Sequence, residues 1–260
     1  MNFLRALVLS LLLVAPASAA DYVAGPSGGS QLPGTATNDN AAAGNVGEYQ
    51  SNSCATQTAT VTFTGTTTNL VVWATSPTIT ALCPVFFTTT GTLPSGIAAS
   101  TTYYVTNNAS LTSASFQIST TLALAQAGTA IALASNGTAT TTGIEGSILG
   151  TTTVLAQTAL NLTAGDWDTQ CTLQFTGASS TTSTSEGVAI SSSATTLGAQ
   201  PGALTLLDAT LPATSTSSQL ATPTVRVSLS ATTIYYCNGY SNFSTSTMQG
   251  NPFIRARRVR

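Results

Sequence analysis

DWDTQCTLQF, at residues 166–175, alternates with a period of two between a polar set and a mostly apolar set of side chains. Successive side chains of a strand point to opposite faces, so this period predicts a strand with one face in a core. The side chains expected on that inner face are Trp167, Thr169, Cys171, Leu173 and Phe175. Strand-like runs also occupy 154–162, 203–208, 224–229, 232–243 and 252–260. Strands at this spacing indicate a jelly roll or β-sandwich.

The first half of the chain carries a second group of short β-type runs. They lie at 61–65, 70–74, 84–90, 101–106, 114–119 and 129–134. Turn residues separate them, as in LPSG at 93–96, where Pro and Gly suit a type I turn. TLALAQA at 121–127 favours a short helix that ends at Gly128. No charged residue occurs from 50 to 144, and this segment is expected to form a small β module.

The composition supports an all-β fold and excludes several kinds of enzyme. Threonine is about one residue in five, and its β-branched side chain favours strands. The 260 residues contain no histidine and no lysine. This excludes a Ser-His-Asp triad, a histidine metal site, a lysine Schiff base and a phosphate-loop lysine. The net charge of -2 gives no basis for general nucleic-acid binding, so no nucleic-acid partner is expected.

The N-terminus has the layout of a secretory signal peptide. A positively charged start at 1–5 precedes an apolar run at 6–15, which Pro16 ends. ASA at 17–19 supplies the small residues that signal peptidase recognises, and 1–20 is expected to be removed. The alternative is an uncleaved anchor, but the run is shorter than the about 20 apolar residues that cross a bilayer. A secreted, extracellular or surface-displayed protein without a membrane span is expected.

Export affects how the four cysteines are interpreted, because compartments outside the cytoplasm favour disulfides. No CxxC spacing is present, so the pattern indicates neither a zinc site nor a thioredoxin-type site. Four cysteines allow three pairings. We favour Cys54 with Cys83 and Cys171 with Cys237, and buried free thiols are the alternative. Residues 21–47, rich in Gly, Pro, Asn and Ala, are expected to form a flexible leader or an attachment arm.

Residues 86–128 (FFTTTGTLPSGIAASTTYYVTNNASLTSASFQISTTLALAQAG) resemble a small β module that recurs in tail and fibre proteins of tailed bacteriophages. The shared elements are TGTLP at 90–94, Gly96, TTYYV at 101–105 and FQ at 116–117. The resemblance covers about a sixth of the chain. It implies a virion or surface decoration module without catalytic residues.

The second half resembles a group of uncharacterised phage and prophage virion-associated proteins. The shared elements are GEY at 47–49, LTAGDWD at 162–168, VRVSLSATTIYY at 225–236, FSTSTM at 243–248 and IRARRVR at 254–260. Their order is also similar in pattern to the trimeric jelly-roll heads of the complement and tumour-necrosis-factor type. The resemblance implies a domain of 48–55 plus 145–260, an inserted module at 56–144, and a homotrimer. Phage structural proteins assemble in the cytoplasm, so the signal peptide departs from this pattern.

Asp166 and Asp168 lie two apart on the polar face of the strand at 166–175. Paired carboxylates serve as acid and base in glycoside hydrolysis, and carboxylates also bind Ca²⁺. No companion motif supports either chemistry. A structural polar face is expected, with no catalytic residue, no metal and no cofactor.

Four arginines crowd the C-terminus in a strand-like alternation: Arg255, Arg257, Arg258 and Arg260. Ion pairs with acids are expected, within the domain or across a subunit interface. The expected acidic partners are Asp166, Asp168 and Glu186. The alternative is that the arginines bind an anionic polymer on a host surface.

Tyrosines are the candidate ligand contacts. The Tyr-Tyr pairs at 103–104 and 235–236 place one ring inward and one outward in a strand. Outward rings stack on sugars at low entropic cost. The candidate contacts for a cell-surface glycan are Tyr104, Tyr236 and Tyr240.

These observations predict an all-β jelly roll or sandwich with an inserted small β module, and a non-enzymatic attachment protein. The expected partners are further copies of the chain, virion proteins or a cell-surface glycan. The alternative is a bacterial secreted adhesin or surface-layer accessory protein. A polysaccharide-degrading enzyme is a remote alternative, and it rests on the Asp pair alone.

Overall fold

The described residues form an all-β fold, as the sequence predicts. The computed structural model describes residues 40–66, 68–73, 79–138, 140–198, 202–212 and 217–260. These belong to one unit that spans 40–260. The expected signal peptide, 1–20, and the first part of the expected leader, 21–39, lie outside the described residues. The strands form three sheets with antiparallel pairing, and α1 is a short helix (Leu122–Gln126).

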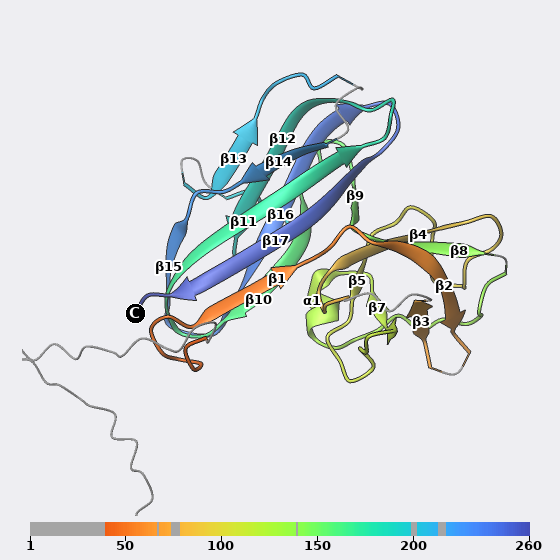
Figure 1. The fold of residues 1–260 in the computed structure, drawn as a ribbon, viewed down its shortest axis with the longest axis horizontal. Coiled ribbons are helices and arrows are strands. Elements are labelled where there is room, and N and C mark those ends of the chain that lie inside the picture. The colour runs from red at the N-terminus through yellow and green to blue at the C-terminus, as the bar shows by residue number, and fades with distance from the viewer. Residues whose placement is uncertain (1–39, 67, 74–78, 139, 199–201, 213–216) are drawn as a thin grey trace, which may run out of the picture. The chain divides into compact units, whose positions relative to one another are not determined.

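Two of the sheets contain the long strands of the second half of the chain. The first has the order β1-β17-β11-β14, with β15 also paired to β11 and β9 paired to β17. Its strands are β1 (Tyr49–Ser53), β9 (Ser147–Leu149), β11 (Gly165–Gly177), β14 (Ser217–Ala221), β15 (Val225–Leu229) and β17 (Met248–Arg258). The second has the order β10-β16-β12-β13. Its strands are β10 (Leu155–Leu162), β12 (Thr182–Ser191), β13 (Leu204–Leu207) and β16 (Thr233–Ser244). Figure 1 shows β11 and β17 side by side along their length.

These two sheets pack face to face and form a β-sandwich. The predicted inner face of β11 is confirmed, because its five alternating side chains from Trp167 to Phe175 are buried. Opposite them, the second sheet contributes buried side chains to the same cluster, including Leu162, Val188 and Ile190. The predicted disulfide between Cys171 and Cys237 is confirmed, and it joins β11 to β16 across the core. The two layers are therefore linked covalently.

The third sheet contains the short strands of the first half of the chain, in the order β6-β3-β2-β8-β4-β5-β7. Its strands are β2 (Thr58–Thr64), β3 (Leu70–Trp73), β4 (Pro84–Thr89), β5 (Tyr103–Val105), β6 (Ser115–Phe116), β7 (Ile118–Ser119) and β8 (Thr141–Glu145). Its core combines aliphatic and aromatic side chains, and the rings of Phe63 and Phe87 meet edge to face at 5.3 Å. The proposed division into a domain of 48–55 plus 145–260 and an inserted module of 56–144 stays a prediction.

The segment after β7 departs in part from its expected structure. The expected helix is present as α1, where the Thr121 hydroxyl accepts a hydrogen bond from the Leu124 N–H. Gly128 follows with a φ of +75°, which glycine adopts without strain. Residues 129–134, expected as a strand, belong to no strand. Their hydrogen bonds are irregular, because Ile131 donates to a backbone carbonyl and Leu133 to the Asn69 side chain.

The third sheet is tied to the sandwich by a disulfide and by hydrogen bonds. The predicted disulfide between Cys54 and Cys83 is confirmed, and it joins the residue after β1 to the residue before β4. The Tyr104 hydroxyl donates to the Ala156 carbonyl at 2.6 Å. The Ile148 N–H donates to the Thr102 hydroxyl at 2.8 Å. Each disulfide thus connects two sheets, and such bonds are typical of proteins in oxidising compartments.

The end of the expected flexible leader, 40–47, is held against β1 and β17. The Asn40 side chain donates to the Tyr49 carbonyl at 2.8 Å and accepts from the Tyr49 N–H at 2.7 Å. The Gly47 N–H donates to the Arg258 carbonyl at 2.9 Å. This corrects the expected leader at its end, because residues 40–47 contact the strands. None of the helical structure in the described ranges is long and apolar enough to cross a bilayer.

The disulfide across the sandwich core should contribute measurably to stability. Replacing both Cys171 and Cys237 by alanine should lower the free energy of unfolding by about 2–4 kcal/mol, because the bond closes a long loop in the unfolded chain. Urea unfolding of C171A/C237A beside the parent protein, without reductant, measures this difference. An unfolding midpoint equal to that of the parent would contradict the role assigned to the bond.

Candidate functional site

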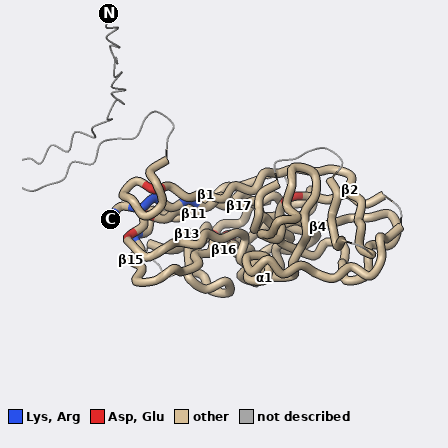
Figure 2. Tube along the Cα trace, turned by 90° about the horizontal axis from the view of Figure 1, so that it is seen from below, with Lys and Arg blue, Asp and Glu red and all other residues tan. Residues whose placement is uncertain are grey.

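Most charged side chains of the described residues gather around one end of the first sheet. Every arginine in this part of the chain lies on β15, on β17 or just after β17. Figure 2 shows these arginine positions near the C-terminus, with acidic positions beside them, while most of the remaining tube is uncharged. In a chain with only 5% charged residues, this concentration makes the surface the candidate functional site.

The register of the first sheet places these side chains in two rows. In the first row, Tyr49 of β1 lies opposite Arg257 of β17, which lies opposite Asp168 of β11, which lies opposite Arg226 of β15. In the next row, Ser51, Arg255 and Gln170 face one another in the same way. These side chains and Asp166 form what we call the outer charged face. It points away from the core, because the alternate residues of β11 and β17 are buried.

Hydrogen bonds and ion pairs neutralise only part of the outer charged face. Asp168 pairs with the Arg226 Nε at 2.6 Å, and Asp166 pairs with the Arg260 Nε at 2.9 Å. The Ser228 hydroxyl and then the Arg260 guanidinium hold the pKa of Asp166 below its ordinary value. Arg255 donates to the neutral Gln170 Oε1 at 2.9 Å.

A pocket of about 270 Å³ opens on the outer charged face. Its lining combines two arginines, one acid, one aromatic ring and neutral polar groups. The lining residues are Tyr49, Asp168, Gln170, Thr224, Arg255, Ala256 and Arg257. We call this hollow the outer pocket.

Arg258 alone among the strand β17 arginines turns inward, and only 4% of it is exposed. Its Nε pairs with Glu48 at 2.9 Å, and its Nη1 donates to the Ala164 carbonyl at 2.6 Å. The guanidinium lies over the Trp167 ring, 4.3 Å from the centroid, in a cation–π contact. Burial favours a higher pKa for Glu48, but hydrogen bonds from Gly44 and Gln50 and the pair with Arg258 together hold that pKa below its ordinary value.

The ion pairs expected from the sequence are present only in part. Asp166 pairs with Arg260, one of the four expected arginines. Asp168 pairs with Arg226 instead, and Arg258 pairs with Glu48. Arg226 reaches Asp168 because β15 lies beside β11. Glu186, the third expected partner, accepts a hydrogen bond from the Ser218 hydroxyl instead.

Two of the three tyrosines expected to contact a glycan are buried, which corrects that prediction. Tyr104 is 3% exposed and Tyr236 is 8% exposed, and both rings pack in one cluster with Leu122 of α1. Their outward side is covered because the third sheet, α1 and β10 meet there. Burial also raises the pKa of Tyr104 above the ordinary range. Tyr240 keeps part of its surface accessible.

Tyr49 is the exposed ring that the sequence analysis missed. It is 40% exposed and lies in the outer pocket beside Arg257. Its sequence context, a short polar strand after a Gly-rich segment, contains no apolar alternation that would mark it. The GEY element at 47–49 was the available signal, but only the pairing of β1 with β17 brings that ring to the arginines.

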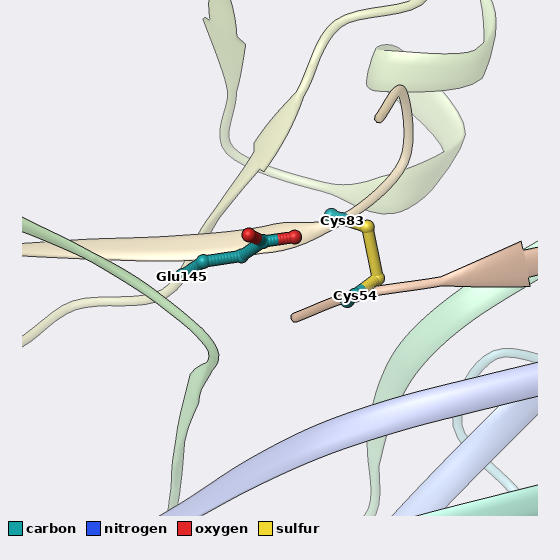
Figure 3. A group of neighbouring side chains, drawn as sticks. All are labelled: Cys54, Cys83 and Glu145. Atoms are coloured by element: carbon teal, nitrogen blue, oxygen red, sulfur yellow. A yellow bond between two sulfur atoms is a disulfide. The ribbon is translucent and has the colours of Figure 1, made fainter. Parts of the chain in front are cut away.

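A buried acid lies beside one disulfide, as Figure 3 shows for Glu145 with Cys54 and Cys83. One carboxylate oxygen and the two sulfurs all lie within 4.8 Å of one another. Metal ligation by cysteine needs a thiolate, and these sulfurs are bonded to each other, so the cluster does not suit a metal ion. Glu145 is 1% exposed and accepts hydrogen bonds from the Ala55 N–H and the Gln57 amide. Burial raises the pKa of Glu145 to about 8.

The comparisons with known proteins add little to this geometry. No family model and no curated protein sequence matches the chain. A solved structure described as the structure of infectious bursal disease virus, Gx strain, is similar with 8% identity and a TM-score of 0.29. The likeness covers 81% of this chain and 57% of that chain. A likeness of this size supports no inference about function.

The lack of a side chain at Gly165 should be essential for the inward position of Arg258. Gly165 has a φ of +136°, and a Cβ there would lie 1.9 Å from the Arg258 Nη1. Gly202 has a similar φ of +124° but open space around it, so it is the matched control. G165A should therefore lower the free energy of unfolding by about 3 kcal/mol more than G202A does, because it displaces a buried ion pair. Equal losses in urea unfolding would contradict the role of Arg258.

Glu145 should make stability fall as pH rises. Between about pH 4.5 and 8 the folded protein keeps a proton that the unfolded chain has lost, so the free energy of unfolding decreases through this window. Glutamine resembles the protonated acid, so E145Q should be more stable than the parent at pH 8, by on the order of 3 kcal/mol, and similar near pH 4.5. Urea unfolding from pH 4.5 to 8.5 measures both curves, and parallel curves would contradict the expectation.

Proposed function

We propose that the protein is a non-enzymatic attachment protein of phage or prophage origin, displayed as a homotrimer on a virion or a cell surface. The observation that carries this proposal is the outer charged face. Most charged side chains of the described residues lie in it or directly beneath it, on a β scaffold whose sheets are joined by two disulfides. A rigid scaffold that presents one polar face is suited to binding a surface.

The environment of the two strand aspartates supports a non-enzymatic role. A general acid needs a carboxyl group whose pKa is raised toward neutrality. The pKa of Asp166 is lowered instead, and both carboxylates are engaged in ion pairs with arginines. This arrangement suits a fixed polar face better than glycoside hydrolysis.

The sequence resemblances support the virion assignment. The segment at 86–128, which is similar to a module of phage tail and fibre proteins, supplies most of β4, β5, β6 and β7 together with α1. The Trp167 strand and the C-terminal arginines, which are similar to elements of phage virion-associated proteins, form the outer charged face and its buried support.

A bacterial secreted adhesin is the second candidate, and one observation favours it. The predicted signal peptide and the two disulfides both fit a chain that matures in an oxidising compartment. Phage structural proteins that assemble in the cytoplasm have no such step. The location of the protein therefore distinguishes a phage virion protein from a bacterial secreted adhesin.

Immunogold electron microscopy with an antibody against the protein tests where it is displayed. After prophage induction of the source strain, the label should decorate released particles. Label on the cell envelope together with unlabelled particles would support the secreted adhesin. Label on neither would contradict surface display in both forms.

The purified full chain should bind intact cells of the source species in a saturable manner and sediment as three chains. A sedimenting mass of one chain would contradict the trimer. It should also leave cell polysaccharide intact, because the two strand aspartates are engaged in ion pairs instead of being poised as acid and base. Reducing ends released by the parent protein but not by D166N/D168N would support the polysaccharide-degrading alternative instead.

A further inference from the structure

The outer pocket keeps an excess of positive charge after its internal contacts are counted. Arg257 has no hydrogen-bond or ion-pair partner among the described residues. Arg255 is bonded to the neutral Gln170, which leaves its charge uncompensated. Asp168 is the one carboxylate in the lining, and Arg226 neutralises it from outside the pocket. Two guanidinium groups therefore face this hollow without an acid of their own.

The positions of the two arginines suit recognition of an acidic group. Arg255 and Arg257 are two residues apart on β17, so they point to the same side and their Cα atoms lie about 7 Å apart along the strand. A guanidinium group binds a carboxylate through two parallel N–H bonds. The bond to Gln170 holds the Arg255 guanidinium in place before any ligand arrives. Such prior fixation lowers the entropy lost on binding.

The remaining lining groups suit a sugar ring. Tyr49 presents an exposed aromatic ring beside Arg257, and aromatic rings stack against the apolar faces of sugars. The Thr224 hydroxyl and the Gln170 amide offer further polar contacts to sugar hydroxyls. A volume of about 270 Å³ lies at the small end of ligand pockets, which suits one ring with its neighbours outside.

We propose that the outer pocket binds one carboxylate-bearing sugar unit of a cell-surface polysaccharide. The two arginines bind the carboxylate, and Tyr49 stacks against the ring. This inference rests on the proposed attachment function and names the class of ligand that the outer charged face binds. A nucleic acid fits less well, because Arg226 and Arg260 are already paired with Asp168 and Asp166, and two arginines are too few for a continuous line of phosphates.

Calorimetric titration of the full chain with carboxylated probes and their uncharged matches tests the ligand class. The probes are tetragalacturonate with its methyl ester, and sialyllactose with lactose. At least one acidic probe should bind at least about tenfold more tightly than its uncharged match, and this preference should weaken as salt rises. Equal binding within both pairs would overturn the proposal. So would a preference for sulfated lactose or single-stranded DNA over both acidic probes.

Variants of residues on β17 and β1 test whether the acidic probe binds in the outer pocket. R255Q/R257Q should weaken binding of the preferred acidic probe at least about tenfold, and Y49S should weaken it severalfold. R260Q is the matched control, because it removes an arginine from the same end of the sheet but outside the pocket lining. It should leave the affinity within about twofold. Thermal unfolding of each variant separates lost contacts from lost folding, and folded R255Q/R257Q with parental affinity would overturn the assignment.

The inference and the proposed function fail in different ways. Cell adsorption that R255Q/R257Q leaves unchanged would overturn the acidic-sugar site and keep the attachment function. Binding of the acidic probe without adsorption to any cell would keep the site and overturn the attachment function.

Discussion

The buried guanidinium of Arg258 fixes the arrangement on which the outer charged face depends. It is held by Glu48, by the Trp167 ring and by the carbonyl of Ala164, so the turn into β11, the segment before β1 and the end of β17 meet at one group. Because side chains alternate along a strand, an inward Arg258 directs Arg255 and Arg257 outward. A shift of the β17 register by one residue would place the side chains of Arg255 and Arg257 in the core. Buried ion pairs stabilise weakly compared with apolar packing, and setting register is their best-attested use.

A second fixed point lies where the chain passes between the sandwich and the third sheet. The chain leaves the sandwich after β1 and returns at the end of β8, and both passages are tied at one place. The Cys54–Cys83 disulfide clamps the outgoing passage, while Glu145 on the returning passage accepts hydrogen bonds from Ala55 and Gln57. The Asn251 side chain of β17 donates to the Glu145 carbonyl at 3.0 Å. Burying an ionised carboxylate that has only neutral hydrogen-bond donors costs free energy, so the folded protein favours the protonated form of Glu145. This junction therefore makes the stability of the fold depend on pH, although the rest of the chain has little charge.

The sequence predicted what depends on local pattern and missed what depends on distant pairing. The period-two alternation around Trp167 identified the inner face of β11, and the expected disulfides and helix α1 are present. Strand β12 was not predicted, because its start is rich in Ser and Thr, although most of the strand is buried. Tyr104 was expected to point outward to solvent, but α1 and β10 cover that side. The partners of the arginines follow from β15 lying beside β11 and from the contact of Glu48 with β17, which no local pattern reveals.

The ion pairs on the outer charged face determine which ligands this face can bind selectively. Asp166 and Asp168 each hold one arginine, and this leaves positive charge only at Arg255 and Arg257. At physiological salt, a field from two charges fades within about 8 Å, so it acts on a group that enters the pocket and hardly on a distant one. Polyanions of high charge density gain little from such a face, because the paired arginines are not available to them and only two arginines of the described residues remain without an acid. A single acidic group joined to an uncharged ring needs only these two arginines, and it also gains the contact with Tyr49. Selectivity then arises from the acids that surround the arginines as much as from the arginines themselves.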